Sequence, residues 1–141
     1  MTARVRFMHG TALMEFALAW PVALVLVLGA VETAVWGSEA FAARSAALAG
    51  ARAGAVAGAN PAVAADVATR TLAPSLVGVA ASGWCPGDSL QQPAVWICAR
   101  DLGDAVEVVV GGEVPALVPL VGEPGLPLHA RVTVEKEVFA R

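Results

Sequence analysis

The chain has 141 residues, of which 57% are hydrophobic and only 15% charged, and its length suits one modest domain. A net charge of −3 and the lack of a clustered basic stretch argue against a nucleic-acid partner, because phosphate binding needs clustered lysine and arginine. The two histidines do not lie at zinc-finger spacing from the two cysteines, and we expect no metal and no cofactor.

The first ten residues form a short basic segment that precedes a long apolar run. Arg4, Arg6 and His9 lie in this segment, and no acidic residue comes before Glu15. Charge of this polarity orients a membrane segment with its N-terminus in the cytoplasm. The part of the chain beyond the run is therefore expected outside the cytoplasm.

The apolar run is free of charge from residue 16 to residue 31, which is about 24 Å of helix at about 1.5 Å per residue. The hydrocarbon core of a bilayer is about 30 Å thick, so a spanning helix must include Glu15 and Glu32 near its ends. Trp20 and Trp36 then lie towards the two interfaces, where tryptophan is favoured. Pro21 falls inside the run and should weaken or kink the helix.

Residues 38–59 are nearly all small, and we expect the helix to continue to about Gly58, because alanine is the best helix former. Gly50, Gly54 and Gly58 recur every four residues on one helix face, and Ala46 continues the row. A row of small residues at this spacing lets another helix approach closely. Its partner could be the chain's own sheet, its second helix, or the same helix of a neighbouring subunit; we favour the neighbouring subunit.

The dipeptide Asn60-Pro61 predicts the start of a second helix, with Asn as the N-cap and Pro at the first helical position. This helix should run to about Ala73 and end at Pro74. Its predicted apolar face consists of Ala64, Ala68 and Leu72, widened by Val63 and Val67.

After the second helix the periodicity becomes that of strands. Residues 76–82 are a weak strand candidate, residues 84–98 are expected to form a loop, and residues 105–110 and 128–135 alternate apolar with polar side chains. A proline-stiffened connection separates the last two strands. We predict an α+β fold, in which a long N-terminal transmembrane helix continues into a small domain with a second helix and a three-stranded antiparallel sheet.

The two cysteines, Cys85 and Cys98, lie in the predicted loop and are not spaced as C-x-x-C. If the domain is extracytoplasmic, a disulfide between them is expected. If it is cytosolic, two free thiols are expected instead. We also expect Trp84 and Trp96 to pack beside the bridge.

The most informative motif starts at Gly10, where the sequence GTALMEF joins the basic segment to the apolar run. A secretory signal is cut after its apolar region, whereas here a candidate site lies before it. An acid such as Glu15 at the membrane edge is costly unless it is paired. Cleavage between Gly10 and Thr11 would create a charged amine close to Glu15 along the helix. That amine, on the same or a neighbouring subunit, could offset the burial of the carboxylate.

This segment resembles the class III signal of type IV pilins and, more closely, the N-terminus of TadE-like proteins, the minor pseudopilins of the tight-adherence (Flp) pilus system. The resemblance covers about residues 10–58 and rests on Gly10, Glu15-Phe16, Pro21, Glu32 and the Ala/Arg-rich continuation of the helix. It implies cleavage by a prepilin peptidase and an assembly role for Glu15 and Phe16 among other pilin or pseudopilin subunits. The expected parts are then a leader over residues 1–10, a transmembrane helix over 11–36 and an extracytoplasmic, pilin-like domain over 37–141.

Three other interpretations remain open. The chain could be an uncut single-pass membrane protein of the cytoplasmic membrane whose outer domain binds a ligand, or a secreted protein cut after Ala42. It could also be an enzyme, because His129, Arg131 and Glu135 share one side of a predicted strand, but no nucleophile accompanies them. We expect no enzymatic activity. A loose acidic cluster, Asp101, Asp104 and Glu107, does not match the ligand spacing of an EF-hand loop.

Overall fold

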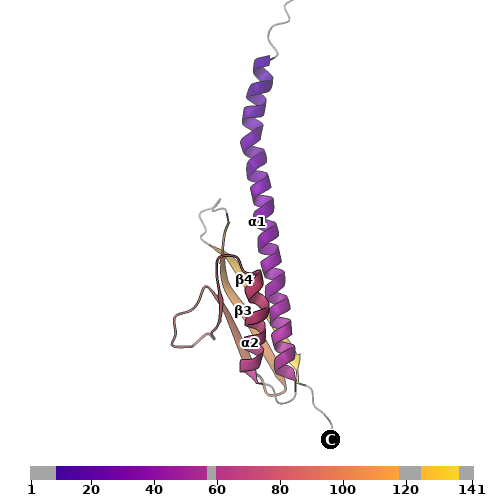
Figure 1. Cartoon of the computed structure of the whole chain (residues 1–141), viewed down its shortest axis with the longest axis vertical. Helices are drawn as coiled ribbons and strands as arrows, with labels where there is room; N and C mark the ends of the chain where they lie inside the picture. The colour runs from indigo at the N-terminus through magenta and orange to yellow at the C-terminus, as the bar shows by residue number, and fades with distance from the viewer. Residues whose placement is uncertain (1–8, 57–59, 118–124, 137–141) are drawn as a thin grey trace, which may run out of the picture.

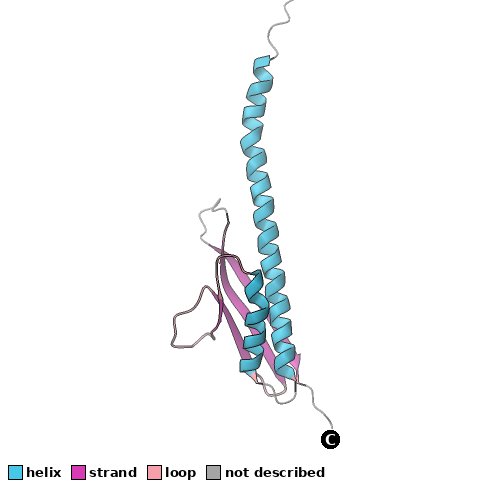
Figure 2. Ribbon diagram, viewed as in Figure 1, coloured by secondary structure: helices cyan, strands magenta, loops and turns pink. Residues whose placement is uncertain are grey.

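The computed structural model describes residues 9–56, 60–117 and 125–136, with side chains from residue 14 onward. It contains two α-helices, a short 3-10 helix and one four-stranded sheet (Figures 1 and 2). In chain order the elements are α1 (His9–Ala55), α2 (Pro61–Leu72), η1 (Ala73–Ser75), β1 (Ala81–Gly83), β2 (Val95–Asp101), β3 (Ala105–Pro115) and β4 (Gly125–Glu135). The fold is α+β, as predicted.

Helix α1 is one continuous element of 47 residues, about 70 Å long at about 1.5 Å per residue. It continues through Pro21 and through residue 36, where the sequence predicted the end of the membrane span. Figure 1 shows its N-terminal half extending alone, while its C-terminal half lies along the domain. One continuous helix therefore has an exposed half and a half that packs on the domain.

The C-terminal half of α1 joins the core through very small side chains. Ala43, Ala46, Ala47 and Ala51 are fully buried. They pack against the valine-rich face of the sheet and against α2, and the bulk of the core comes from the strands. The largest buried side chains of the sheet are Val95, Ile97, Val106, Val108, Val110 and Val114.

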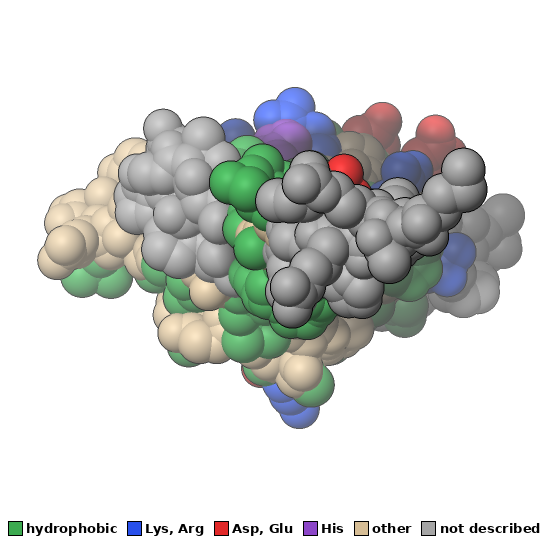
Figure 3. All heavy atoms as spheres, turned by 90° about the horizontal axis from the view of Figure 1, so that it is seen from above, with side chains coloured by type: hydrophobic (Ala, Val, Ile, Leu, Met, Phe, Trp, Pro, Cys, Tyr) green, Lys and Arg blue, Asp and Glu red, His purple; other side chains and the backbone are tan. Residues whose placement is uncertain are grey.

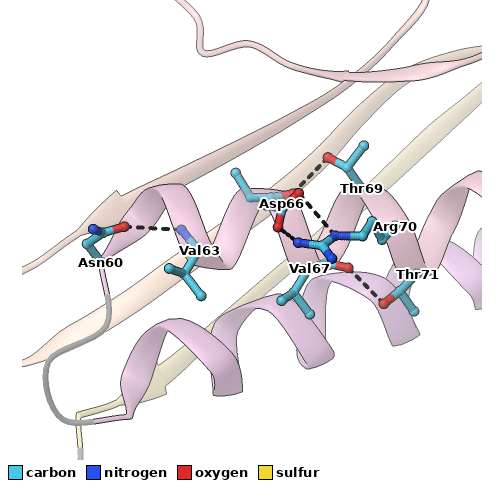
Figure 4. A network of polar contacts seen from close by, with 8 residues as sticks. Asn60, Val63, Asp66, Val67, Thr69, Arg70 and Thr71 are labelled. Atoms are coloured by element: carbon cyan, nitrogen blue, oxygen red, sulfur yellow. Dashed lines mark hydrogen bonds and ion pairs between the residues drawn. The ribbon is translucent and has the colours of Figure 1, made fainter.

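Helix α2 begins and ends where the sequence predicted. The Asn60 side chain accepts a hydrogen bond from the backbone N–H of Val63 at 3.1 Å, and Pro61 occupies the first helical position (Figure 4). Ala64, Ala68 and Leu72 are buried, as expected. On the opposite side of the helix, Asp66 and Arg70 form an exposed ion pair one turn apart, which contributes little to stability.

The sheet has four strands in the order β1-β2-β3-β4 and is mixed, so the prediction of three antiparallel strands is wrong. The missed strand is β2, which lies in the segment predicted to be a loop and contains Cys98. The prediction gave weight to the cysteines and to Gly/Pro residues over the β-branched and aromatic residues from Val95 to Cys98. Strand β1 has only three residues and pairs with β2 in parallel.

Strands β3 and β4 confirm the predicted alternation and extend it. Val106, Val108 and Val110 are buried on the helix-covered face, while His129 and Arg131 point to the exposed face. The two strands pair in antiparallel register along their whole length, from Ala105 opposite Glu135 to Pro115 opposite Gly125. The connection between them is shorter than predicted, and residues 118–124 of it lie outside the described part.

Candidate functional site

The predicted processing site lies in the first turns of α1. The backbone of Gly10 and Thr11 is helical, and the Thr11 side chain is outside the described residues. Glu15 is exposed, and Phe16 stacks on Trp20 with ring centroids 6.1 Å apart along the helix surface. Pairing of Glu15 with the Thr11 amine stays a prediction, because that amine exists only after cleavage.

The following stretch of α1 is apolar on every side and touches no other described element. All side chains from residue 14 to residue 27 are exposed. The large ones are Met14, Phe16, Leu18, Trp20, Val22, Leu24, Val25, Leu26 and Val27, with Val31 one turn later. The helix is long and apolar enough to be a candidate membrane span near the N-terminus. An apolar surface of this extent needs lipid or protein to cover it.

Three side chains on one face of α1 attach the helix to the domain. Glu32 Oε1 accepts a hydrogen bond from the backbone N–H of Leu117 at 3.0 Å. One turn later, the indole Nε1–H of Trp36 donates to the carbonyl oxygen of Pro127 at 3.1 Å. At the next turn, Glu39 Oε1 accepts from the backbone N–H of Val77 at 3.2 Å. The spacing of four and then three residues keeps all three on one side of the helix.

Glu39 is the only charged residue buried among those the structure describes, with 4% of its surface exposed. A buried carboxylate is costly unless hydrogen bonds satisfy it, and the Val77 N–H supplies one. Sequence analysis missed this residue. The only available signal was its position, as an isolated acid just before a long run of small residues. An acid in that position is ordinarily expected to be exposed to solvent.

The glycine row faces the interior of the same subunit. A Cβ placed on Gly50 would lie 2.5 Å from the backbone oxygen of Ala64 and 2.8 Å from the Ala68 Cβ. A Cβ on Gly54 would lie 2.7 Å from the Ala64 Cβ and 3.0 Å from Val106 Cγ1. The expectation that these glycines meet a neighbouring subunit is therefore wrong, because α2 and β3 already fill the space. Gly58 lies outside the described residues.

Cys85 and Cys98 form a disulfide, which joins the start of the β1–β2 connection to the face of β2 that lies opposite the helices. Trp84 and Trp96 pack edge to face with ring centroids 5.7 Å apart, and the Trp84 indole donates to the carbonyl oxygen of Leu90 at 3.0 Å. The Trp96 ring lies over Gly111 of β3, where a Cβ would collide with it. These contacts form a second, smaller packed layer on the sheet face opposite the helices.

Two ion pairs lie on the strands or just beyond their ends. Arg131 Nε lies 3.5 Å from Glu107 Oε1, and His129 on the same strand is exposed. Figure 3, which looks along the long axis, shows basic and histidine side chains together at one edge of the molecule.

Lys136 Nζ donates to both oxygens of Asp101 at 2.7 Å, and this contact, with the Gly103 N–H, lowers the pKa of Asp101. Within the described ranges no three acidic, histidine or cysteine side chains gather to hold a metal ion.

The domain also has an open depression of about 820 Å³ at the end of the sheet where β3 ends. The Trp96 ring, Gln91, Gln92 and Glu113 are among the side chains that line it. Aromatic, amide and carboxylate groups together give this surface both stacking and hydrogen-bonding capacity.

No family model, curated protein or solved structure matches the chain.

Proposed function

We propose that the chain is a minor pilin or pseudopilin subunit, cut by a prepilin peptidase, that takes part in assembling a pilus or related secretion apparatus of the tight-adherence type. The observation that carries the proposal is the division of α1. Its first half is apolar and free of contacts with the described domain, and its second half is the central helix of the domain core. The Gly10 to Phe16 motif at the start of this helix adds the processing signal.

The division suggests how such a subunit would work. In the precursor, lipid of the cytoplasmic membrane covers the apolar half of α1, and the domain lies on the extracytoplasmic side. In an assembly, the apolar halves of neighbouring subunits replace that lipid and pack helix against helix. The domain needs no rearrangement in this exchange, because its own core does not use residues 14–27.

A second candidate is an uncut single-pass membrane protein with an extracytoplasmic binding domain. The depression lined by Trp96, Gln91, Gln92 and Glu113 favours it, because it offers a ligand-sized surface outside the core. The two candidates differ in the fate of the N-terminus.

The first test is the mature N-terminus. Mass spectrometry of the protein from its native host should find a chain that begins at Thr11. Gly10→Leu should leave the full-length precursor in the membrane, because a bulky residue blocks the peptidase site. Gly29→Leu is the matched control, since a Cβ there meets no atom within 4 Å, and it should be cut normally. A wild-type protein that starts at Met1 would support the uncut candidate, and one that starts at Ala43 would support a secreted protein.

The second test concerns the acid at the membrane edge. Glu15→Gln keeps the size of the side chain and removes its charge. The variant should be inserted and cut, but far less of it should cross-link to a partner subunit. The physical reason is the loss of pairing between the carboxylate and the Thr11 amine of a neighbour. Glu15→Asp, which keeps the charge, should assemble better than Glu15→Gln. Equal assembly by wild type and Glu15→Gln would show that the charge is dispensable.

A further inference from the structure

We propose that the end of the domain where β3 leads into the β3–β4 connection rests in the interface of the lipid bilayer, and that Glu32 fixes its depth there. The surface consists of Leu117 together with the neighbouring turn of α1 at Val31. This inference rests on the proposed membrane insertion of α1. It adds that lipid is a partner of the domain itself as well as of the helix.

The depth follows from the helix geometry. The middle of the charge-free stretch, residues 16–31, falls between Ala23 and Leu24. Glu32 lies eight or nine residues further on, roughly 13 Å along the axis, whereas half of a hydrocarbon core is about 15 Å thick. The Glu32 carboxylate is therefore placed at the edge of the hydrocarbon. Trp36 lies one turn further out, among the headgroups, where tryptophan is favoured.

Both side chains bind the same end of the sheet. Glu32 accepts from the N–H of Leu117, which follows β3 closely, and Trp36 donates to Pro127, near the start of β4. The two contacts set this end of the β3–β4 pair at the depth of the membrane edge. The opposite end, at the turn before Ala105, lies roughly 33 Å away at about 3.3 Å per residue of strand.

The chemistry of this end suits an interface and neither water nor hydrocarbon alone. The Leu117 side chain is apolar and 49% exposed, and it adjoins the exposed apolar surface of α1. Non-helical backbone cannot enter hydrocarbon, because its polar groups would lose their hydrogen bonds. The hydrogen bond between the Leu117 N–H and Glu32 lets this end of the sheet lie close to the hydrocarbon. It satisfies one backbone N–H, and it also stabilises a carboxylate that is costly near lipid. Continuity with the candidate membrane span argues for lipid, and against a protein partner, as the occupant.

A pair of labelled leucine positions tests this placement. Leu117→Cys and Leu102→Cys each add one thiol for an environment-sensitive fluorophore, because the native cysteines are joined in a disulfide. Leu102 is the matched control, since it is also leucine, is 53% exposed and lies at the opposite end of the sheet. The full-length chain is placed in vesicles of phosphatidylcholine and phosphatidylglycerol, with and without nitroxide-labelled lipid. We expect a blue shift and strong nitroxide quenching at position 117, and neither at position 102.

The outcomes separate this inference from the proposed function. If the protein floats with the vesicles but position 117 is quenched no more than position 102, the lipid contact of the domain is wrong and membrane insertion stands. If the protein does not float, both fail. Glu32→Ala should reduce quenching at position 117, whereas Glu32→Gln, whose amide oxygen can accept the same N–H, should largely retain it. Unchanged quenching in Glu32→Ala would overturn the depth-setting role of Glu32.

Discussion

Gly50→Ala should lower the melting temperature of the full-length protein in detergent micelles, even though alanine is the better helix former. The added methyl group would lie 2.5 Å from the backbone oxygen of Ala64, and backbone in the first turns of α2 cannot move aside without separating the helices. Overpacking of this kind costs about 1–3 kcal/mol. Because the closest atom belongs to the backbone, we expect a cost in the upper part of that range. The gain in helix propensity, about 1 kcal/mol, is too small to offset it.

Gly37→Ala is the matched control on the same helix. A Cβ at Gly37 meets no atom within 4 Å, so this variant should gain propensity without a clash and melt at or above the wild-type temperature. Opposite signs for the two substitutions are the expected result, measured by near-ultraviolet circular dichroism. A Gly50→Ala protein that is as stable as Gly37→Ala would show that α1 and α2 are not in close contact.

Removing the disulfide should have an effect of similar or larger size. The bridge closes a loop with a sequence separation of 13, for which the chain-entropy estimate is about 3 kcal/mol. A Cys85→Ala and Cys98→Ala double variant is preferable to serine, because Cys98 is 1% exposed and a hydroxyl there would be buried. We expect a clearly lower melting temperature. The tryptophan circular dichroism signal should weaken as well, since Trp84 adjoins Cys85 and packs on Trp96.

A reductant provides the control for this variant. It should destabilise the wild-type protein to a similar degree and leave the double variant unchanged, because the variant has no bridge to lose. Thiol labelling of the wild type under denaturing, non-reducing conditions should find no free cysteine. A wild-type protein whose melting is insensitive to reduction would contradict a stabilising role for the bridge.

The helical part of the fold could be predicted because local signals there agree with the final structure. The small residues after Trp36 indicate that the first helix continues. The Asn60-Pro61 cap marks the start of the second helix, and the apolar face that includes Leu72 shows which side of it is buried. The alternation of β4 is equally local. The row of small residues was recognised as a packing surface, but its partner was not. A glycine row indicates only that another element approaches closely, and here that element is the chain's own second helix, which Asn60 caps.

The missed features depend on contacts between residues far apart in the sequence. Strand β2 was missed, and β1, which overlaps only the end of the weak candidate at residues 76–82, has three small residues and pairs with β2 in parallel. The contact between Glu32 and Leu117 joins residues 85 positions apart, and that between Trp36 and Pro127 joins residues 91 positions apart. No periodicity in either segment reveals such a partner. Sequence analysis noted Trp36 for its place along the membrane span, and Glu32 for that place and for the resemblance, but neither for a contact with the domain.

The uninterrupted course of α1 has a geometric consequence. With no break between its two halves, the direction in which the sheet faces is set by the phase of the helix. One residue inserted within the apolar half, before Glu32, would turn the domain by about 100° and move it by about 1.5 Å along the axis. In the proposed assembly, the number of residues between Glu15 and Glu32 would therefore determine which side of the domain a subunit presents to its neighbours, as well as how far the domain stands from the membrane.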